Sequence, residues 1–215
     1  MDVLTRNYYR MIRNGAFGEN EPLEAMSEYK WRKIKQMAEA DNVVAYMRSD
    51  DAHPLPSPPE KAEPTDYSMP SSRRLRHIAD KERHAMDTSV ASLHLLSIMV
   101  HNDEQTLIHR TSLRMIIEMG MFLRHEGDKV DFLKIERWLR KLGIRRLTEL
   151  HCSVLTALLG FNINELPFMR RSSPMAQRLI LRDRKLTVAY LLRYPGTTIS
   201  SWLRHLYNTV TQIEE

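Results

Sequence analysis

The stretch that decides the fold of this chain is residues 113–160, which read LRMIIEMGMFLRHEGDKVDFLKIERWLRKLGIRRLTELHCSVLTALLG. Apolar residues recur in it every three or four positions, which is the spacing of one face of an α-helix. Three such runs follow one another. Their apolar faces are Leu113, Ile116, Ile117, Gly120 and Leu123, then Phe132, Ile135, Trp138, Leu139 and Leu142, then Leu147, Leu150, Val154, Leu155 and Leu158. We therefore expect three consecutive helices that bury these faces.

The ends of these three helices carry signals of their own. Asp131 directly precedes the second apolar run, and its carboxylate can accept from the free backbone N–H groups of a first helical turn. Gly127, Gly143 and Gly160 follow the three runs. Glycine commonly ends a helix because it adopts a left-handed backbone without steric cost. We predict helix boundaries at these four residues.

Two more helices are predicted near the N-terminus. Their apolar faces are Leu4, Tyr8, Met11 and Ile12 in the first, and Trp31, Ile34, Met37 and Ala38 in the second. Gly15 and Gly18 mark the end of the first helix, and Ser27 can cap the second. The pair Asp41–Asn42 is expected to break the second helix.

The remaining helical patterns lie on either side of residues 113–160. Residues 75–100 form one long helical pattern, which Asn102 and Asp103 are expected to interrupt. Toward the C-terminus, helices are predicted over residues 174–193 and 199–213, the first of them opened by Ser173 and Pro174. No run alternates with the period of two that a half-buried strand requires. The sequence therefore predicts an all-α fold.

A proline-rich segment divides the chain. Residues 51–70 contain six of the ten prolines, and proline removes a backbone donor and disfavours helix at the preceding residue. We expect an extended linker there. The predicted organisation is a short N-terminal helical unit over residues 1–50, a linker over 51–72 and a larger helical bundle over 73–215.

The charge of the chain is uneven. The whole sequence carries +5, but residues 133–215 hold 14 Lys and Arg against 6 Asp and Glu. A basic half favours an acidic partner, nucleic acid included. The arginine pairs Arg145–Arg146 and Arg170–Arg171 are the candidate basic surface. A solvated basic face is the simpler interpretation, because aromatic residues that could stack on bases are sparse around these pairs.

The sequence contains no complete catalytic motif. The seven glycines form no phosphate-binding loop, and neither HExxH nor GxSxG occurs. Asp80, His84 and Asp87 share one helical face and could hold a metal, but a solvated face explains them better. The single cysteine, Cys152, lies in an apolar run and is expected to be buried. We expect no catalytic residue, no metal and no cofactor.

The sequence shows neither a secretory signal nor a membrane-spanning segment. The first residues contain no apolar stretch of the kind found in secretory signals. The apolar runs are far shorter than the roughly 20 residues that span a bilayer. A cytoplasmic protein without a membrane partner is expected.

Two parts of the chain resemble a known family. Residues 8–44, YYRMIRNGAFGENEPLEAMSEYKWRKIKQMAEADNVV, and residues 113–147 and 158–168 are similar to the helical ends of the uncharacterised nucleotidyltransferase-like proteins of Bacteroides-type bacteria (Bacteroidetes). The residues that carry the first part are Ile12, Gly15, Phe17, Gly18 and Trp31. The resemblance implies a helical scaffold. It implies no catalytic residue, because the proline-rich segment occupies the place of the family's metal-binding α/β core.

Three functions follow from these observations. The first is a non-catalytic helical interaction or regulatory protein related to that family, with another protein as its partner. The second is a nucleotidyltransferase with an unrecognised site. The third is a basic regulator that binds nucleic acid through the C-terminal part.

Overall fold

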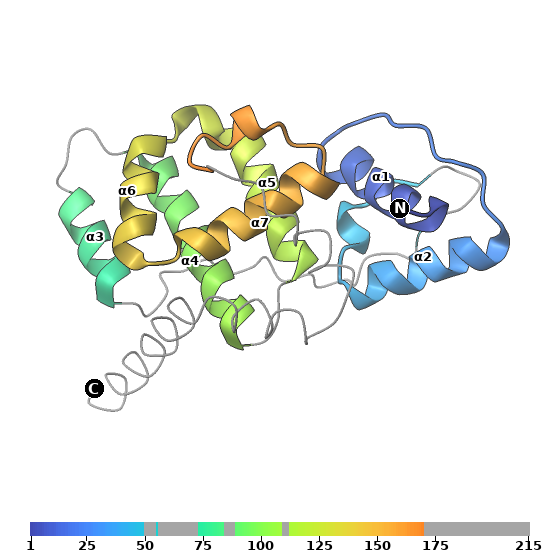
Figure 1. The fold of residues 1–215 in the computed structure, drawn as a ribbon, viewed down its shortest axis with the longest axis horizontal. Coiled ribbons are helices and arrows are strands. Elements are labelled where there is room, and N and C mark those ends of the chain that lie inside the picture. Colours follow the sequence, from blue (N-terminus) through green and yellow to red (C-terminus); the bar gives the residue numbers. More distant parts are fainter. Residues whose placement is uncertain (50–54, 56–72, 84–88, 109–111, 170–215) are drawn as a thin grey trace.

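The computed structural model describes residues 1–49, 55, 73–83, 89–108 and 112–169. In these ranges the chain forms α-helices and short 3-10 helices and contains no strand, so the all-α prediction is confirmed (Figure 1). The α-helices are α1 (Val3–Ala16), α2 (Glu28–Ala40), α3 (Arg73–Arg83), α4 (Val90–Ile108), α5 (Leu113–Glu126), α6 (Phe132–Leu142) and α7 (Arg145–Leu158). The 3-10 helices are η1 (Val44–Tyr46), η2 (Gly127–Lys129) and η3 (Ile163–Glu165). None of the helices in the described ranges is both long and apolar enough to cross a bilayer.

The N-terminal helices bury the predicted faces. Met11 and Ile12 of α1 and Ile34 of α2 are fully buried. Asn42 adopts a left-handed backbone directly after α2, at the predicted break. Ser27 occupies the cap position of α2, although its side chain makes no capping hydrogen bond.

Gly15 has a different role from the predicted one. It lies inside α1 rather than at its end, which is at Ala16. A Cβ atom at position 15 would lie 2.4 Å from the carbonyl oxygen of Tyr46 and 2.7 Å from the amide nitrogen of Arg48. Glycine is therefore needed because the backbone after η1 crosses α1 at this point, where the Arg48 amide donates to the Met11 carbonyl at 3.0 Å.

The single long helix predicted over residues 75–100 is wrong, and so is the predicted interruption at Asn102 and Asp103. Two helices, α3 and α4, occupy this region, and the Ser89 hydroxyl accepts from the Ser92 amide at the start of α4. Asn102 and Asp103 lie within α4 and are buried. The Asn102 amide donates to the Met115 carbonyl at 3.2 Å, so this side chain bonds to α5 instead of competing for the backbone of its own helix.

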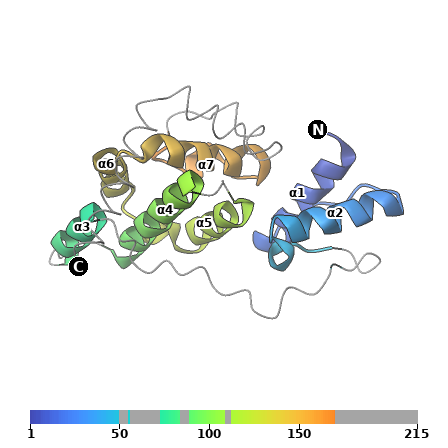
Figure 2. The ribbon, with the colours of Figure 1, turned by 90° about the horizontal axis from the view of Figure 1, so that it is seen from below.

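Helices α4 to α7 form the bundle, in which α4 and α5 lie side by side, α7 packs against both, and α6 packs against α4 and α7 (Figures 1 and 2). The Asp131 cap is confirmed, since its carboxylate accepts from the Lys134 amide at 3.0 Å. Gly143 and Gly160 adopt the predicted left-handed backbone. Gly127 does follow α5, but with a right-handed backbone that continues into η2.

The N-terminal helices and the bundle share one hydrophobic core. Phe17 packs edge-on against Phe161 with ring centroids 5.2 Å apart, and the Tyr46 hydroxyl donates to Glu118 at 2.6 Å. Both contacts join residues before the proline-rich segment to residues of the bundle. The predicted helices over 174–193 and 199–213 lie outside the described residues, as does the predicted linker except Leu55.

Candidate interaction face on α6 and α7

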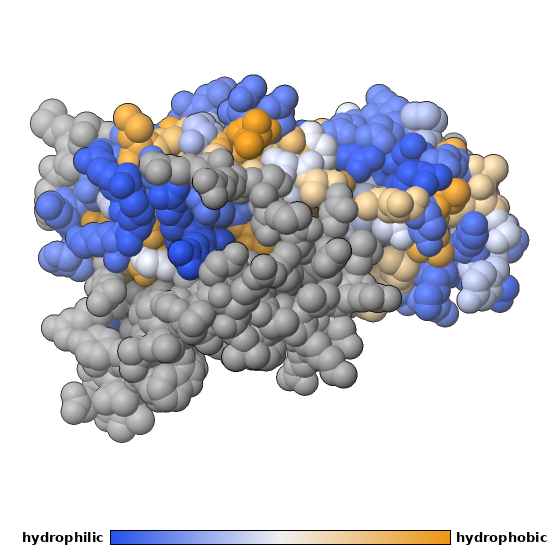
Figure 3. All heavy atoms as spheres, in the orientation of Figure 1, coloured by the Kyte–Doolittle hydropathy of each residue, from blue (hydrophilic) through white to orange (hydrophobic). Residues whose placement is uncertain are grey.

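Helices α3, α6 and α7 concentrate the positive charge of the molecule. Together they hold eleven Lys and Arg against four Asp and Glu, a net charge of +7, whereas the whole chain carries +5. Helix α6 packs against both α3 and α7. Strongly hydrophilic residues accordingly gather at this end of the molecule, beside a few apolar ones (Figure 3).

The outer face of α6 combines cations with one apolar side chain. Its inner face, with Ile135 and Leu139, is buried in the core. On the opposite side, Leu133 is 75% exposed and is followed by exposed Arg137 and Arg140. These three residues are four and three positions apart, so they lie along one side of the helix. Lys141, also exposed, extends the row to the end of α6. We call these four residues the basic face.

The predicted pair at the start of α7 borders this basic face. Arg146 is exposed, whereas Arg145 is only partly exposed. The Arg145 guanidinium lies 3.0 Å from the Glu149 carboxylate and 3.8 Å from that of Glu136 on α6. A cation in the first turn of a helix is disfavoured by the helix dipole, and these two carboxylates offset that cost. Arg145 therefore joins α6 to α7.

Sequence reasoning found only part of this surface. It identified Arg145 and Arg146 but did not single out Arg137, Arg140 and Lys141. The helical period could have identified them, because Arg137, Arg140 and Lys141 lie on the side of the predicted helix opposite its apolar face. Arg170 and Arg171, the other predicted pair, lie outside the described residues.

Cys152, the single cysteine of the chain, and the neighbouring His151 are both buried in α7. Cys152 is fully buried as predicted, and burial raises the pKa of its thiol. Burial lowers the pKa of the neighbouring His151 to about 4, and its Nε2 lies 3.1 Å from the Thr106 hydroxyl.

Of the three residues that could share a metal on one helical face, the structure describes one. Asp80 is exposed on α3, and His84 and Asp87 lie outside the described residues. Within the described ranges, no group of three or more His, Cys, Asp or Glu side chains is arranged to hold a metal ion.

Comparisons with known proteins find no matching family model, no matching curated protein and no matching solved structure. The use of the basic face is therefore inferred from its own charge, exposure and neighbours.

Proposed function

We propose that this chain is a non-catalytic helical interaction protein whose basic face binds an acidic segment of another protein. The observation that carries the proposal is the exposure of Leu133 in line with Arg137 and Arg140 on α6. Protein interfaces commonly place an apolar anchor at the centre and polar or charged groups around it.

Each part of the basic face has a physical role in such a complex. Burying the Leu133 side chain fully would contribute roughly 1.5–3 kcal/mol. The cations beside it would attract an acidic partner and speed its association, and salt would weaken this attraction. A partner with alternating acidic and apolar residues fits both features.

The aromatic side chains near the basic face favour a protein partner over single-stranded nucleic acid. Binding to single strands relies on exposed aromatic side chains for stacking. Trp138 of α6 is buried, and the exposed aromatic residue in the described ranges is Tyr29 on α2. Contact with duplex phosphates requires only cations, so duplex DNA is the competing partner to be tested.

A binding experiment separates the two partners. The full chain is titrated into a fluorescent peptide of about 15 residues that alternates Glu or Asp with Leu, and in parallel into a 20-base-pair duplex. We expect saturable binding to the peptide and weaker binding to the duplex at about 0.15 M salt. Tighter binding to the duplex than to the peptide would contradict the proposal.

Matched variants locate the binding surface. Arg137→Glu with Arg140→Glu should weaken peptide binding at least tenfold, because two attractive charges become repulsive. The control reverses two exposed cations of α2, Arg32→Glu with Lys33→Glu, and should leave affinity within about twofold. Equal losses in both variants would show that only net charge matters and would refute a specific face.

The resemblance to nucleotidyltransferase-like proteins supports the non-catalytic part of this proposal. A helical relative of that family, located in the cytoplasm, would act as a companion or regulator of a catalytic protein. Thermal denaturation with ATP or CTP and Mg²⁺ tests this directly. We expect an unchanged midpoint, and stabilisation that grows with nucleotide concentration would instead support transferase activity.

A further inference from the structure

The segment between α1 and α2 runs back along α1 and is held there by two asparagines (Figure 1). The Asn7 side-chain amide donates to the Glu24 carbonyl at 2.7 Å, and the Asn7 side-chain oxygen accepts from the Glu24 amide at 3.0 Å. Asn14 makes the same two hydrogen bonds with the backbone of Glu21, each at 2.9 Å. Both asparagines are buried. We call residues 20–26 the strap.

The spacing of these contacts is that of a helix that binds an extended peptide. Asn7 and Asn14 are seven positions apart, which is two helical turns or about 10 Å along α1. Glu21 and Glu24 are three positions apart, and an extended segment of the polyproline II type advances about 9 Å in three residues. It also completes one turn in three residues, so the backbone groups of both residues point to the same side. These hydrogen bonds therefore recognise an extended backbone.

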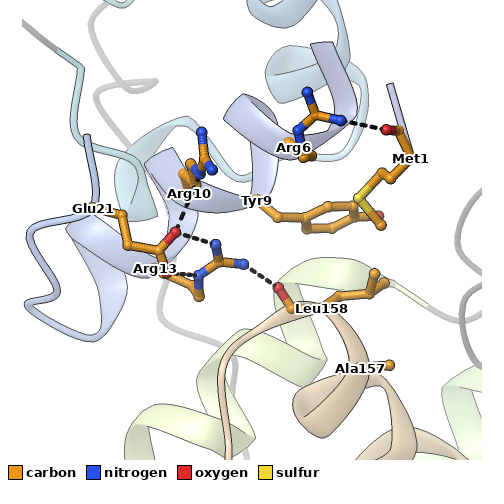
Figure 4. Close-up of a pocket in the computed structure, with 8 residues that line it drawn as sticks. All are labelled: Met1, Arg6, Tyr9, Arg10, Arg13, Glu21, Ala157 and Leu158. Atoms are coloured by element: carbon orange, nitrogen blue, oxygen red, sulfur yellow. Dashed lines mark hydrogen bonds and ion pairs between the residues drawn. The ribbon is translucent and has the colours of Figure 1, made fainter. Parts of the chain in front are cut away.

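The arginines of α1 recognise the acidic side chains of the strap. Glu24 pairs with Arg6 and with Arg10, in both cases at 2.7 Å. Glu21 pairs with Arg10 at 3.2 Å and with Arg13 at 2.5 Å (Figure 4). The three arginines are four and three positions apart, so they share one side of α1. Backbone and side-chain contacts together select an extended segment with two glutamates three positions apart.

Polar contacts of this kind hold the strap almost alone. None of its seven residues is buried; Leu23 and Met26 are partly exposed. The side chains of Glu21 and Glu24 are 36% and 35% exposed, so water and salt screen their ion pairs. Segments with few buried apolar contacts open at a small fraction of the free energy of global unfolding. The strap therefore belongs to the least stable part of the N-terminal helical unit.

We propose that the strap is an internal ligand that covers a docking site for an extended acidic segment of a partner protein. Local opening exposes Asn7, Asn14 and the arginines of α1, and a partner segment with the Glu-x-x-Glu pattern then makes the same hydrogen bonds and ion pairs. The partner competes with a strap whose effective concentration is about 1 mM. The strap thus keeps the affinity of the site low until it is released. The site is separate from the basic face on α6 and does not depend on the function of that face.

Hydrogen exchange of the full chain tests the opening. The backbone amides of Glu21 and Glu24 donate to the two asparagines, whereas the amide of Ile12 lies within α1. We expect protection factors for the two strap amides about 100-fold lower than for Ile12. Raising the salt from about 0.05 M to about 0.5 M should lower them further and leave Ile12 unchanged. Equal protection of all three amides would overturn the proposal, because the strap would then open only with the whole fold.

Strap exchange is tested with a peptide that has the sequence of residues 19–27, ENEPLEAMS. The peptide is added to the full chain and to the variant Glu21→Gln with Glu24→Gln, which keeps the strap backbone but loses its ion pairs. Because the open fraction of the variant is larger, the peptide should bind it about tenfold more tightly than the parent protein. NMR should show saturable shifts of the side-chain amide signals of Asn7 and Asn14.

A matched variant and a matched peptide complete the experiment. Glu39→Gln with Asp128→Asn removes two exposed carboxylates outside the strap and should bind the peptide as the parent protein does. A peptide with glutamine in place of both strap glutamates should bind the strap variant about tenfold more weakly than the acidic peptide. Equal affinity of the peptide for the two variants would overturn the proposal. Shifts on α6 without shifts at Asn7 and Asn14 would also overturn it, while leaving the role of the basic face intact.

Discussion

Replacing Gly15 by alanine should destabilise the protein, although alanine is the better helix former. In an exposed helix the change would contribute about 1 kcal/mol of stability. Here the new Cβ would lie 2.4 Å from the Tyr46 carbonyl oxygen and 2.6 Å from the Met47 carbonyl carbon. These are backbone atoms that cannot rotate away, so we take about 3 kcal/mol, the upper end of the usual cost of overpacking. The expected net loss is about 2 kcal/mol.

Urea denaturation followed by circular dichroism measures this loss. For a chain of this size it corresponds to a fall of roughly 4–8 °C in Tm. Gly127→Ala is the matched control, because its backbone is right-handed and no atom lies within 4 Å of the new Cβ. That variant should be as stable as the parent protein or up to about 1 kcal/mol more stable. If Gly15→Ala were as stable as Gly127→Ala, the close crossing of α1 by residues 46–48 would be refuted.

Three further predictions concern buried and charged side chains. Tyr8→Phe should lower the free energy of unfolding by about 1 kcal/mol through loss of the Asp41 hydrogen bond, whereas Tyr9→Phe should change it by less than about 0.5 kcal/mol; chemical denaturation of both variants checks this. Arg6, with Arg10, lowers the pKa of Glu24 from 4.5 to about 2. This carboxylate therefore stabilises the fold fully above pH 4.5, and the stabilisation is lost as the pH falls toward 2. Glu24→Gln should remove that part of the acid sensitivity, and a parallel pH profile for both proteins would argue against it. Burial lowers the pKa of His151 from 6.5 to about 4, so stability should fall as the pH drops from 6.5 to 4, and His151→Gln should flatten this fall in a pH series of urea denaturations.

The sequence predicted the helices whose signals are local. For α6, the Asp131 cap, the apolar stripe and Gly143 all lie within one short segment, and each was found as predicted. The break predicted at Asn102 failed because the partner of this side chain, the Met115 carbonyl, lies on the next helix. Tertiary contacts of this kind override local preference, and periodicity does not reveal them.

The candidate sites likewise contain features that follow from local sequence and features that depend on tertiary contacts. The exposure of Arg137 and Arg140 follows from the helical period once the buried face is known. Tyr8 and Tyr9 look equivalent in the sequence, and the hydrogen bond of the Tyr8 hydroxyl to Asp41 depends on how the end of α2 lies beside α1. The role of Gly15 likewise depends on the path of residues 46–48, which no local pattern predicts.

The proposed interaction through the basic face is tested most directly by mapping it. Backbone amide NMR spectra of the full chain are recorded while the acidic, leucine-containing peptide is added. We expect the largest shifts at Leu133, Arg137, Arg140 and Lys141 and in the first turn of α7, with residues of α2 unaffected. Shifts confined to other helices, or no shifts at a saturating peptide concentration, would contradict a binding role for this face.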